Sequence, residues 1–297
     1  MKSDANLNRE VESYIRGEGA DSVGFASIGR FEKAPQGHRP QDYLPDAVSV
    51  ISLAVRLADG VCDVWGHPSE PGKTIGPYLF YGGGLFLNLE LGRLANRTAK
   101  MLEDRGYKAV IFPPAGEPSV YRWRGTRQGE SLADFSHKHA AVAAGLGEFG
   151  WSNLLITPQF GPRVRLNSVI TNAPLTPSPM YQGEPLCQPE RCGYLCARDC
   201  PAKALSPRES RTATIGAKDF TYAKIDRIRH SYGASGLVKG SGSMRWVEVP
   251  PGPGDYKQLR EAQQGQGVLD KALLDGTTAG FCSICQHHCP APFYRGL

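Results

Sequence analysis

Seven of the eight cysteines in this 297-residue chain lie at or after position 187, in two runs that each end in Cys-Pro. The first run reads Cys-x4-Cys-x3-Cys-x3-Cys-Pro and the second reads Cys-x2-Cys-x3-Cys-Pro. Thiolates at such short spacings can reach one site together, and they are strong ligands for iron and zinc. The chemistry that this pattern indicates is metal ligation. The seven residues are Cys187, Cys192, Cys196, Cys200, Cys282, Cys285 and Cys289.

The spacing favours iron–sulfur clusters over the other uses of cysteine. Bacterial two-cluster ferredoxins repeat Cys-x2-Cys-x2-Cys-x3-Cys-Pro, and the fourth cysteine of each run ligates the other cluster. The first run here has the same tail and a longer head. Zinc would accept two cysteine pairs but leaves both Cys-Pro endings unexplained, and disulfides are uncommon in a reducing cytosol. We therefore predict two 4Fe–4S clusters.

If the ferredoxin wiring applies, the two clusters have unequal ligand sets. One receives Cys187, Cys192, Cys196 and Cys289, and the other receives only Cys200, Cys282 and Cys285. The missing ligand could be His230, Asp219 or the distant Cys62, or the position could stay open. His230 is preferred because imidazole replaces thiolate on iron in some centres. Cys62 is otherwise expected to be a small buried hydrophobic residue.

Composition describes an ordinary soluble protein. The chain is 40% hydrophobic and 21% charged, and its net charge of +5 is spread along the sequence, so nucleic acid is not an expected partner. The densest basic stretch holds Arg122, Arg124 and Arg127. No apolar run reaches the roughly 18 residues that a membrane helix needs, and the first residues form no signal peptide. We expect a cytoplasmic protein without a membrane partner.

Hydrophobic periodicity predicts an α+β fold. Residues 47–55 are apolar and β-branched throughout, as expected of a central strand covered on both faces. We expect a long helix over about 86–105, started by the glycines at 82–84 and stopped by Gly106. The composition changes after Ala173, which predicts two domains, 1–180 and 181–297. The other expected elements are helices over 5–18 and 137–145 and strands over 22–26, 108–112 and 163–171.

The first domain must contain something that uses the electrons. A ferredoxin needs only about 60–100 residues, and much more chain precedes the cysteines. Residues 144–163 are rich in glycine, which suits close approach of the backbone to a large flat ligand. No Walker sequence and no Gly-x-Gly-x-x-Gly after a strand occurs, so a nucleotide is not favoured.

These features together resemble one known group of enzymes. The carriers are the segments 144–147 (Ala-Gly-Leu-Gly), 158–161 (Pro-Gln-Phe-Gly) and 172–175 (Asn-Ala-Pro-Leu), followed by the two Cys-Pro runs. From about residue 75 onward, their order resembles that of epoxyqueuosine reductases and reductive dehalogenases. The resemblance implies a nitroreductase-like α/β sandwich domain that holds cobalamin and a ferredoxin-like domain with two 4Fe–4S clusters.

The resemblance also implies roles for individual residues. Asp134 or His137 would supply a proton to the reduced product, although Asp134 could instead cap the following helix. Tyr78 would line the same cavity as Tyr81. The substrate would be a small electrophile of the epoxide or organohalide type, and electrons would come from a partner such as ferredoxin or flavodoxin. The corrinoid would contact, largely through backbone, Tyr81, Gly145, Gly147, Gly150, Ser152, Asn153 and Leu155.

The chain also departs from these enzymes, and other functions compete. The Asp followed by Ser/Thr-Ala-Pro of epoxyqueuosine reductases is not found before residue 144, and we expect neither their helical-repeat extension nor the twin-arginine leader of respiratory dehalogenases. One alternative is an electron-transfer or activating partner of another corrinoid protein, without a corrinoid of its own. Another is a flavin reductase in which Arg163 or Arg165 meets a phosphate.

Overall fold

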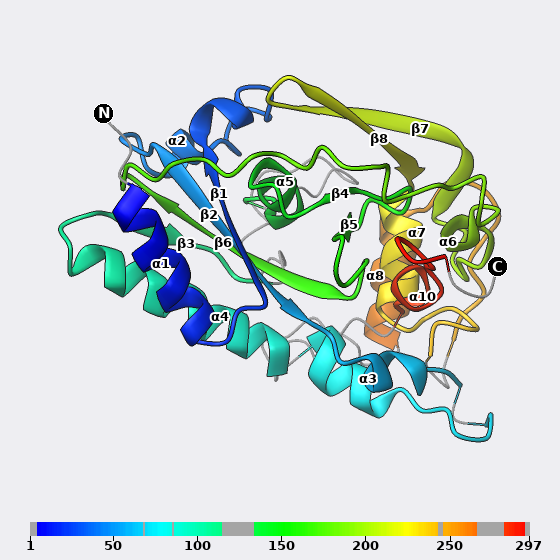
Figure 1. Cartoon of the computed structure of the whole chain (residues 1–297). Coiled ribbons are helices and arrows are strands. Elements are labelled where there is room, and N and C mark those ends of the chain that lie inside the picture. Colours follow the sequence, from blue (N-terminus) through cyan, green and yellow to red (C-terminus); the bar gives the residue numbers. More distant parts are fainter. Residues whose placement is uncertain are drawn as a thin grey trace.

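In the computed structural model of this chain, a four-stranded sheet forms the centre of the larger part (Figure 1). The strand order is β1-β2-β6-β3, and every neighbouring pair is antiparallel, as expected of an α+β fold. The strands are β1 (Ser22–Ser27), β2 (Ser49–Arg56), β3 (Ala109–Ile111) and β6 (Val164–Thr171). The structure describes residues 5–67, 69–84, 86–114, 134–242, 246–265 and 282–294.

Helices cover both faces of this sheet, because successive strand residues point to opposite sides. Ile51 and Leu53 of β2 belong to a core with α1 (Ala5–Gly17) and α4 (Phe86–Glu103). Val50 and Ala54 belong to a second core with α5 (His137–Ala143). All of β2 except Arg56 is buried. The prediction of a central strand covered on both faces is confirmed.

Beyond the sheet, a long hairpin and short helices surround the cysteines. The hairpin joins β7 (Leu205–Ile215) to β8 (Lys218–Ile225), and its buried Ile215 and Phe220 belong to the same core as α5. The hairpin therefore packs on the core of the first predicted domain, although it follows the predicted boundary near residue 180 in the sequence. The helices are α6 (Leu195–Arg198), α7 (Arg227–Ala234), α8 (Tyr256–Gly265) and α10 (Ile284–His287).

The long helix predicted over about 86–105 begins at Phe86, as expected. Gly82 and its two following glycines lie inside η2 (Tyr78–Gly84), which precedes α4. As predicted, that helix ends just before Gly106, whose φ of +83° suits glycine. No helix among the described residues has the length and apolar character to cross a membrane. The other elements are η1 (Ile28–Phe31), α2 (Pro40–Tyr43), α3 (Asp59–Asp63), β4 (Glu148–Phe149) and β5 (Leu155–Ile156).

The predicted basic stretch Arg122, Arg124 and Arg127 lies outside the described residues.

Candidate iron–sulfur site and the adjoining loop

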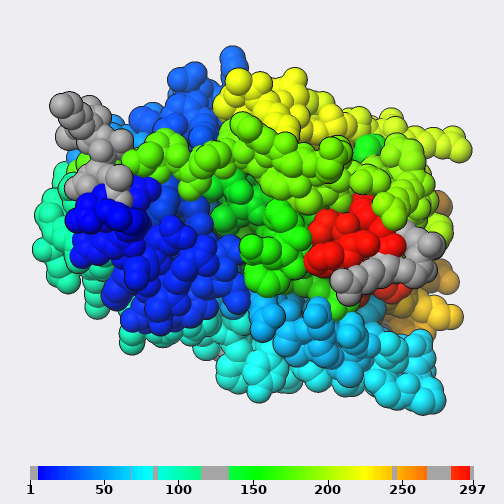
Figure 2. All heavy atoms as spheres, in the orientation of Figure 1, coloured from blue at the N-terminus to red at the C-terminus, as the bar shows by residue number. Residues whose placement is uncertain are grey.

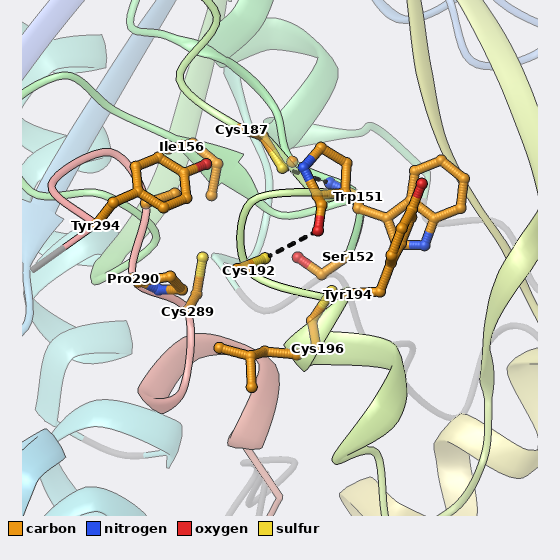
Figure 3. A pocket seen from close by; sticks show the side chains of 14 residues that line it. Trp151, Ser152, Ile156, Cys187, Cys192, Tyr194, Cys196, Cys289, Pro290 and Tyr294 are labelled. Carbon is orange, nitrogen blue, oxygen red and sulfur yellow. Dashed lines mark hydrogen bonds between the residues drawn. The ribbon is translucent and has the colours of Figure 1, made fainter. Parts of the chain in front are cut away.

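Four thiols line one pocket, which we call site one (Figure 3). Three come from α6 and the loop before it, and the fourth comes from the segment after α10. The walls are mostly apolar and include Ile156, Leu195 and Pro290. The structure thus brings together the thiols that the ferredoxin wiring assigns to one cluster. Site one is Cys187, Cys192, Cys196 and Cys289.

Backbone amides point at the thiol sulfurs in both groups of cysteines. The Trp151 amide donates to Cys187 Sγ at 3.3 Å, and the Ala204 amide donates to Cys200 Sγ at 3.4 Å. Cys196, Cys282 and Cys289 also accept backbone hydrogen bonds. Such donors stabilise thiolates and tune a cluster that they hold.

The four thiols of site one surround a hollow, as ligands of four separate irons must. No group of three or more His, Cys, Asp and Glu side chains among the described residues is placed to hold a single metal ion. Burial, with a contribution from neighbouring thiols, raises the pKa of Cys187 and of Cys196 to about 12. Because ligands must be deprotonated, loading this site with metal must release protons.

The remaining three cysteines, Cys200, Cys282 and Cys285, form what we call site two. Burial raises the pKa of Cys285 most, and the charges of thiols from both sites raise it further. A Cβ on Gly233 of α7 would lie 3.9 Å from Cys282 Sγ. His230 lies three residues earlier on the same helix, hence on the same side of it.

The side chain of His230 is exposed. Desolvation by the protein around it lowers its pKa, and the charges of Lys138 and Arg227 add to this effect. A neutral imidazole is the form that binds metals. Its role as the fourth ligand of site two stays a prediction.

The two other candidates for the fourth ligand have different surroundings. Cys62 is 3% exposed and packs with Trp65 and Tyr78, so the prediction of a buried hydrophobic residue is confirmed. Burial raises the pKa of its thiol to about 11. Asp219 lies at the end of the hairpin, where its carboxylate accepts from Thr214 Oγ1 at 2.6 Å.

The C-terminal cysteine segment is attached to distant parts of the chain. His287 Nδ1 lies 2.8 Å from the Cys62 carbonyl, and its ring stacks on Trp65. Gln286 Nε2 donates to the Pro162 carbonyl at 2.6 Å. Figure 2 shows this segment, in red, on the surface between green residues from mid-chain and pale blue residues from around α3. Contacts with residues outside the cysteine runs therefore hold the segment that carries Cys282, Cys285 and Cys289.

The glycines of the loop after α5 pack against protein backbone. A Cβ on Gly145 would lie 2.1 Å from the Pro179 carbonyl oxygen, and one on Gly147 would lie 2.0 Å from the Ile156 carbonyl oxygen. A Cβ on Gly150 would lie 2.9 Å from Ile156 Cγ1 and 3.7 Å from Cys187 Sγ. The first two glycines therefore serve close internal packing, and Gly150 lies beside site one. Their predicted contact with a corrinoid finds no support in these surroundings.

The next residues of the loop connect site one to the partly buried Lys138. Ser152 lines site one, whereas Leu155 is a core residue that is 2% exposed. Asn153 is 8% exposed, and its Oδ1 accepts from Lys138 Nζ at 2.7 Å. Asn153 Nδ2 is buried and has no partner within the described ranges. A buried amide donor is rarely left unpaired, and an acceptor on a ligand would satisfy this atom.

Lys138 is the residue that the sequence reasoning missed. Burial lowers its pKa to about 8, and nearby Arg227 lowers it further, whereas Cys285 raises it. The signal in the sequence is a lysine in the first turn of a short, Ala-rich helix. Lysine is rarely buried without a partner, so a lysine on a helix that packs into the core is a candidate functional residue.

Comparisons with known proteins identify relatives of both predicted kinds, reductive dehalogenases and epoxyqueuosine reductases. Tetrachloroethene reductive dehalogenase of Sulfurospirillum multivorans is 48% identical over 152 residues, which cover 50% of this chain and 22% of that protein. Epoxyqueuosine reductase of Bacillus cereus is 24% identical over 226 residues, which cover 67% of this chain and 52% of that protein. The chain is homologous to both kinds of reductase. No family model matches it.

Solved structures of both kinds share the mixed α+β fold. A catabolic reductive dehalogenase has a TM-score of 0.57 at 16% identity, covering 92% of this chain and 37% of that one. Epoxyqueuosine reductase from Streptococcus thermophilus has a TM-score of 0.52 at 20% identity, covering 98% of this chain and 67% of that one. The chain spans between a fifth and about half of the length of the two curated relatives given above.

Of the two predicted proton donors in this reductase homologue, His137 has both ring nitrogens engaged. Nε2 lies 2.9 Å from the Pro113 carbonyl, so it carries the hydrogen, and Nδ1 accepts from Ser168 Oγ at 3.0 Å. Burial lowers its pKa to about 4, which keeps the ring neutral at pH 7. These contacts describe a structural histidine and leave no free N–H for a substrate.

Asp134, the other predicted donor, is exposed just before α5. Its backbone carbonyl accepts from Tyr43 Oη at 2.5 Å and lies 2.9 Å from His38 Nδ1. The N-cap of α5 is Ser136, so the alternative of Asp134 as that cap is wrong. The role of Asp134 as proton donor stays a prediction.

The two predicted tyrosines differ in their surroundings. Tyr78 is buried and donates from its hydroxyl to Gln286 Oε1 at 2.9 Å, which links η2 to the helix that carries Cys285. Tyr81 is 55% exposed and stacks on Phe86 with ring centroids 4.8 Å apart. Tyr78 is thus a positioning residue for site two, whereas Tyr81 offers an aromatic face to solvent or ligand.

Proposed function

We propose that this chain forms the core of an iron–sulfur reductase, in which two 4Fe–4S clusters pass electrons to a corrinoid that reduces a small electrophile. The observation that carries the proposal is site one, with four thiols around one pocket beside the loop 150–153. Homology to epoxyqueuosine reductase and to reductive dehalogenases supports it.

The residues present suit the clusters. Site one offers four thiols, apolar walls and amide donors to the sulfurs. Site two offers three thiols, and His230 on the adjacent helix is our candidate for its fourth ligand. When bound, clusters of this kind exchange single electrons, at a potential that hydrogen bonds, charge and solvent exposure set.

The residues beside Asn153 suit a corrinoid in part. A corrinoid carries peripheral carboxamides, which offer acceptors to the unpaired Asn153 Nδ2. When bound, it would supply the reducing chemistry. Lys138 would hold a proton on Nζ near neutral pH and donate it to the product, because its pKa is about 8. Asp134 is the second candidate for this proton, and His137 is the least favoured.

One observation favours the alternative of an electron-transfer or activating partner without a corrinoid. Gly145 and Gly147 meet protein carbonyls where the resemblance implies a ligand. The flavin alternative gains nothing comparable, since the Arg163 guanidinium is already paired with Asp59 at 2.6 Å and Asp63 at 3.1 Å.

Anaerobic reconstitution with iron and sulfide, followed by titration with cobalamin, tests the proposal. We expect a brown protein with two clusters per chain that binds micromolar cobalamin with a base-off spectrum. Clusters without cobalamin binding would favour the alternative function. A protein that binds neither iron nor sulfide would refute both. Replacing Asn153 by Ala should weaken cobalamin binding without lowering the iron content.

The partners and the compartment are proposals as well. We propose a small-molecule substrate and a reducing partner such as ferredoxin or flavodoxin. Location in the cytoplasm and the absence of nucleic-acid binding stay predictions from sequence.

A further inference from the structure

The head of the first cysteine run is held by two side chains from outside the run. Four residues separate Cys187 from Cys192, where the ferredoxin pattern has two, so the backbone around Cys187 needs other support. Glu148 Oε1 accepts from the amides of Leu186 at 2.6 Å and Cys187 at 3.4 Å. Tyr294 Oη donates to the Leu186 carbonyl at 3.1 Å and accepts from the Gln188 amide.

Glu148 also brings a negative charge to site one. It lies on β4, is half-buried, and its charge acts on Cys187 and Tyr181. None of the ion pairs found among the described residues includes Glu148. The Arg191 guanidinium lies over the Tyr294 ring, 4.6 Å from the centroid.

We propose that Glu148 keeps the reduction potential of the site-one cluster low. The inference rests on the proposed function, since it requires a cluster at site one. Adding one electron to a cluster makes it more negative, and a fixed carboxylate nearby opposes that change. Glu148 thus both positions the Cys187 backbone and favours the oxidised cluster, which makes the reduced cluster a stronger reductant.

The test is a redox titration of reconstituted protein, with dithionite as reductant and electron paramagnetic resonance as readout. Glu148→Gln keeps an acceptor oxygen but removes the charge. We expect the equilibrium constant for reduction of one cluster to rise about tenfold, which for a one-electron couple equals about 59 mV. The second cluster should change little. Glu184→Gln is the matched control, because it removes an exposed carboxylate that lies three residues before Cys187.

The outcomes separate this inference from the proposed function. Two clusters in the unmodified protein, with one midpoint raised by Glu148→Gln and none by Glu184→Gln, would support it. Unchanged midpoints in Glu148→Gln, or equal shifts in both variants, would overturn it. If Glu148→Gln fails to assemble site one, Glu148→Asp keeps the charge, so its midpoint should stay close to that of the unmodified protein, and a rise of about 59 mV there would refute the inference. Absence of clusters from the unmodified protein would instead refute the proposed function.

Discussion

Gly145 offers a direct test of whether the glycine loop faces a ligand or the protein interior. An alanine there would adopt a φ of +80°, which costs about 1–2 kcal/mol. Its Cβ would also lie 2.1 Å from the Pro179 carbonyl oxygen, so the two backbones must separate by roughly 1 Å. Overpacking of this kind costs about 1–3 kcal/mol. Together, Gly145→Ala should destabilise the protein by about 2–5 kcal/mol.

Urea unfolding followed by far-ultraviolet circular dichroism would measure this change. The control is Gly92→Ala within α4, where a Cβ would meet nothing within 4 Å. Because glycine is a poor helix former, that variant should gain about 0.5–1 kcal/mol. Cobalamin titration of the same variants completes the comparison. If Gly145→Ala unfolds at the wild-type urea concentration but no longer binds cobalamin, the glycine faces the ligand and the packing argument is wrong.

Three further predictions follow from the site. Burial lowers the pKa of Lys138 to about 8, so the rate of substrate reduction should fall above that pH, and Lys138→Arg should lose most of the rate at every pH because arginine does not give up its proton; an unchanged rate and pH profile in Lys138→Arg would exclude Lys138 as the donor. His137 has a folded pKa of about 4, below its ordinary 6.5, so the unfolded state binds more protons between these values and stability falls as pH drops through that window. His137→Phe should lower the free energy of unfolding by about 1–3 kcal/mol at pH 7, because it leaves Ser168 and Pro113 unpaired. It should also weaken the dependence of stability on pH between 4 and 6.5, measured by urea unfolding, without changing the iron content. Cys289→Ser should remove the site-one cluster and about half of the iron, by iron and sulfide analysis, and loss of no iron would contradict the ligand assignment.

The sequence predicted what depends on local pattern. The buried β2, the helix α4 and the grouping of Cys187 with Cys289 all follow from hydrophobic runs or ligand spacing. Homology confirmed the resemblance to the two kinds of reductase. The strand and the helix follow from local pattern alone, whereas the grouping of the cysteines follows from the ligand spacing of ferredoxins.

The remainder depends on contacts between distant segments. The glycines at 145 and 147 pack against Pro179 and Ile156, and no local sequence motif predicts these contacts. Burial by distant segments lowers the pKa of Lys138, and both ring nitrogens of His137 are hydrogen-bonded, one to Pro113 and one to Ser168. The sequence gives the residue types and their spacing, but it does not show which neighbours pair with the hydrogen-bond donors and acceptors of each side chain.

The placement of Cys289 in site one bears on how the protein matures. A cluster held there would tie Cys289 to Cys196, closing a loop of roughly 90 residues, and by analogy with a disulfide such a cross-link removes about 4–5 kcal/mol of chain entropy from the unfolded state. A nascent chain in which Cys289 is still inside the ribosome cannot offer the fourth thiolate. Cluster insertion at site one must therefore follow synthesis of both runs, which makes cofactor delivery a late step of folding.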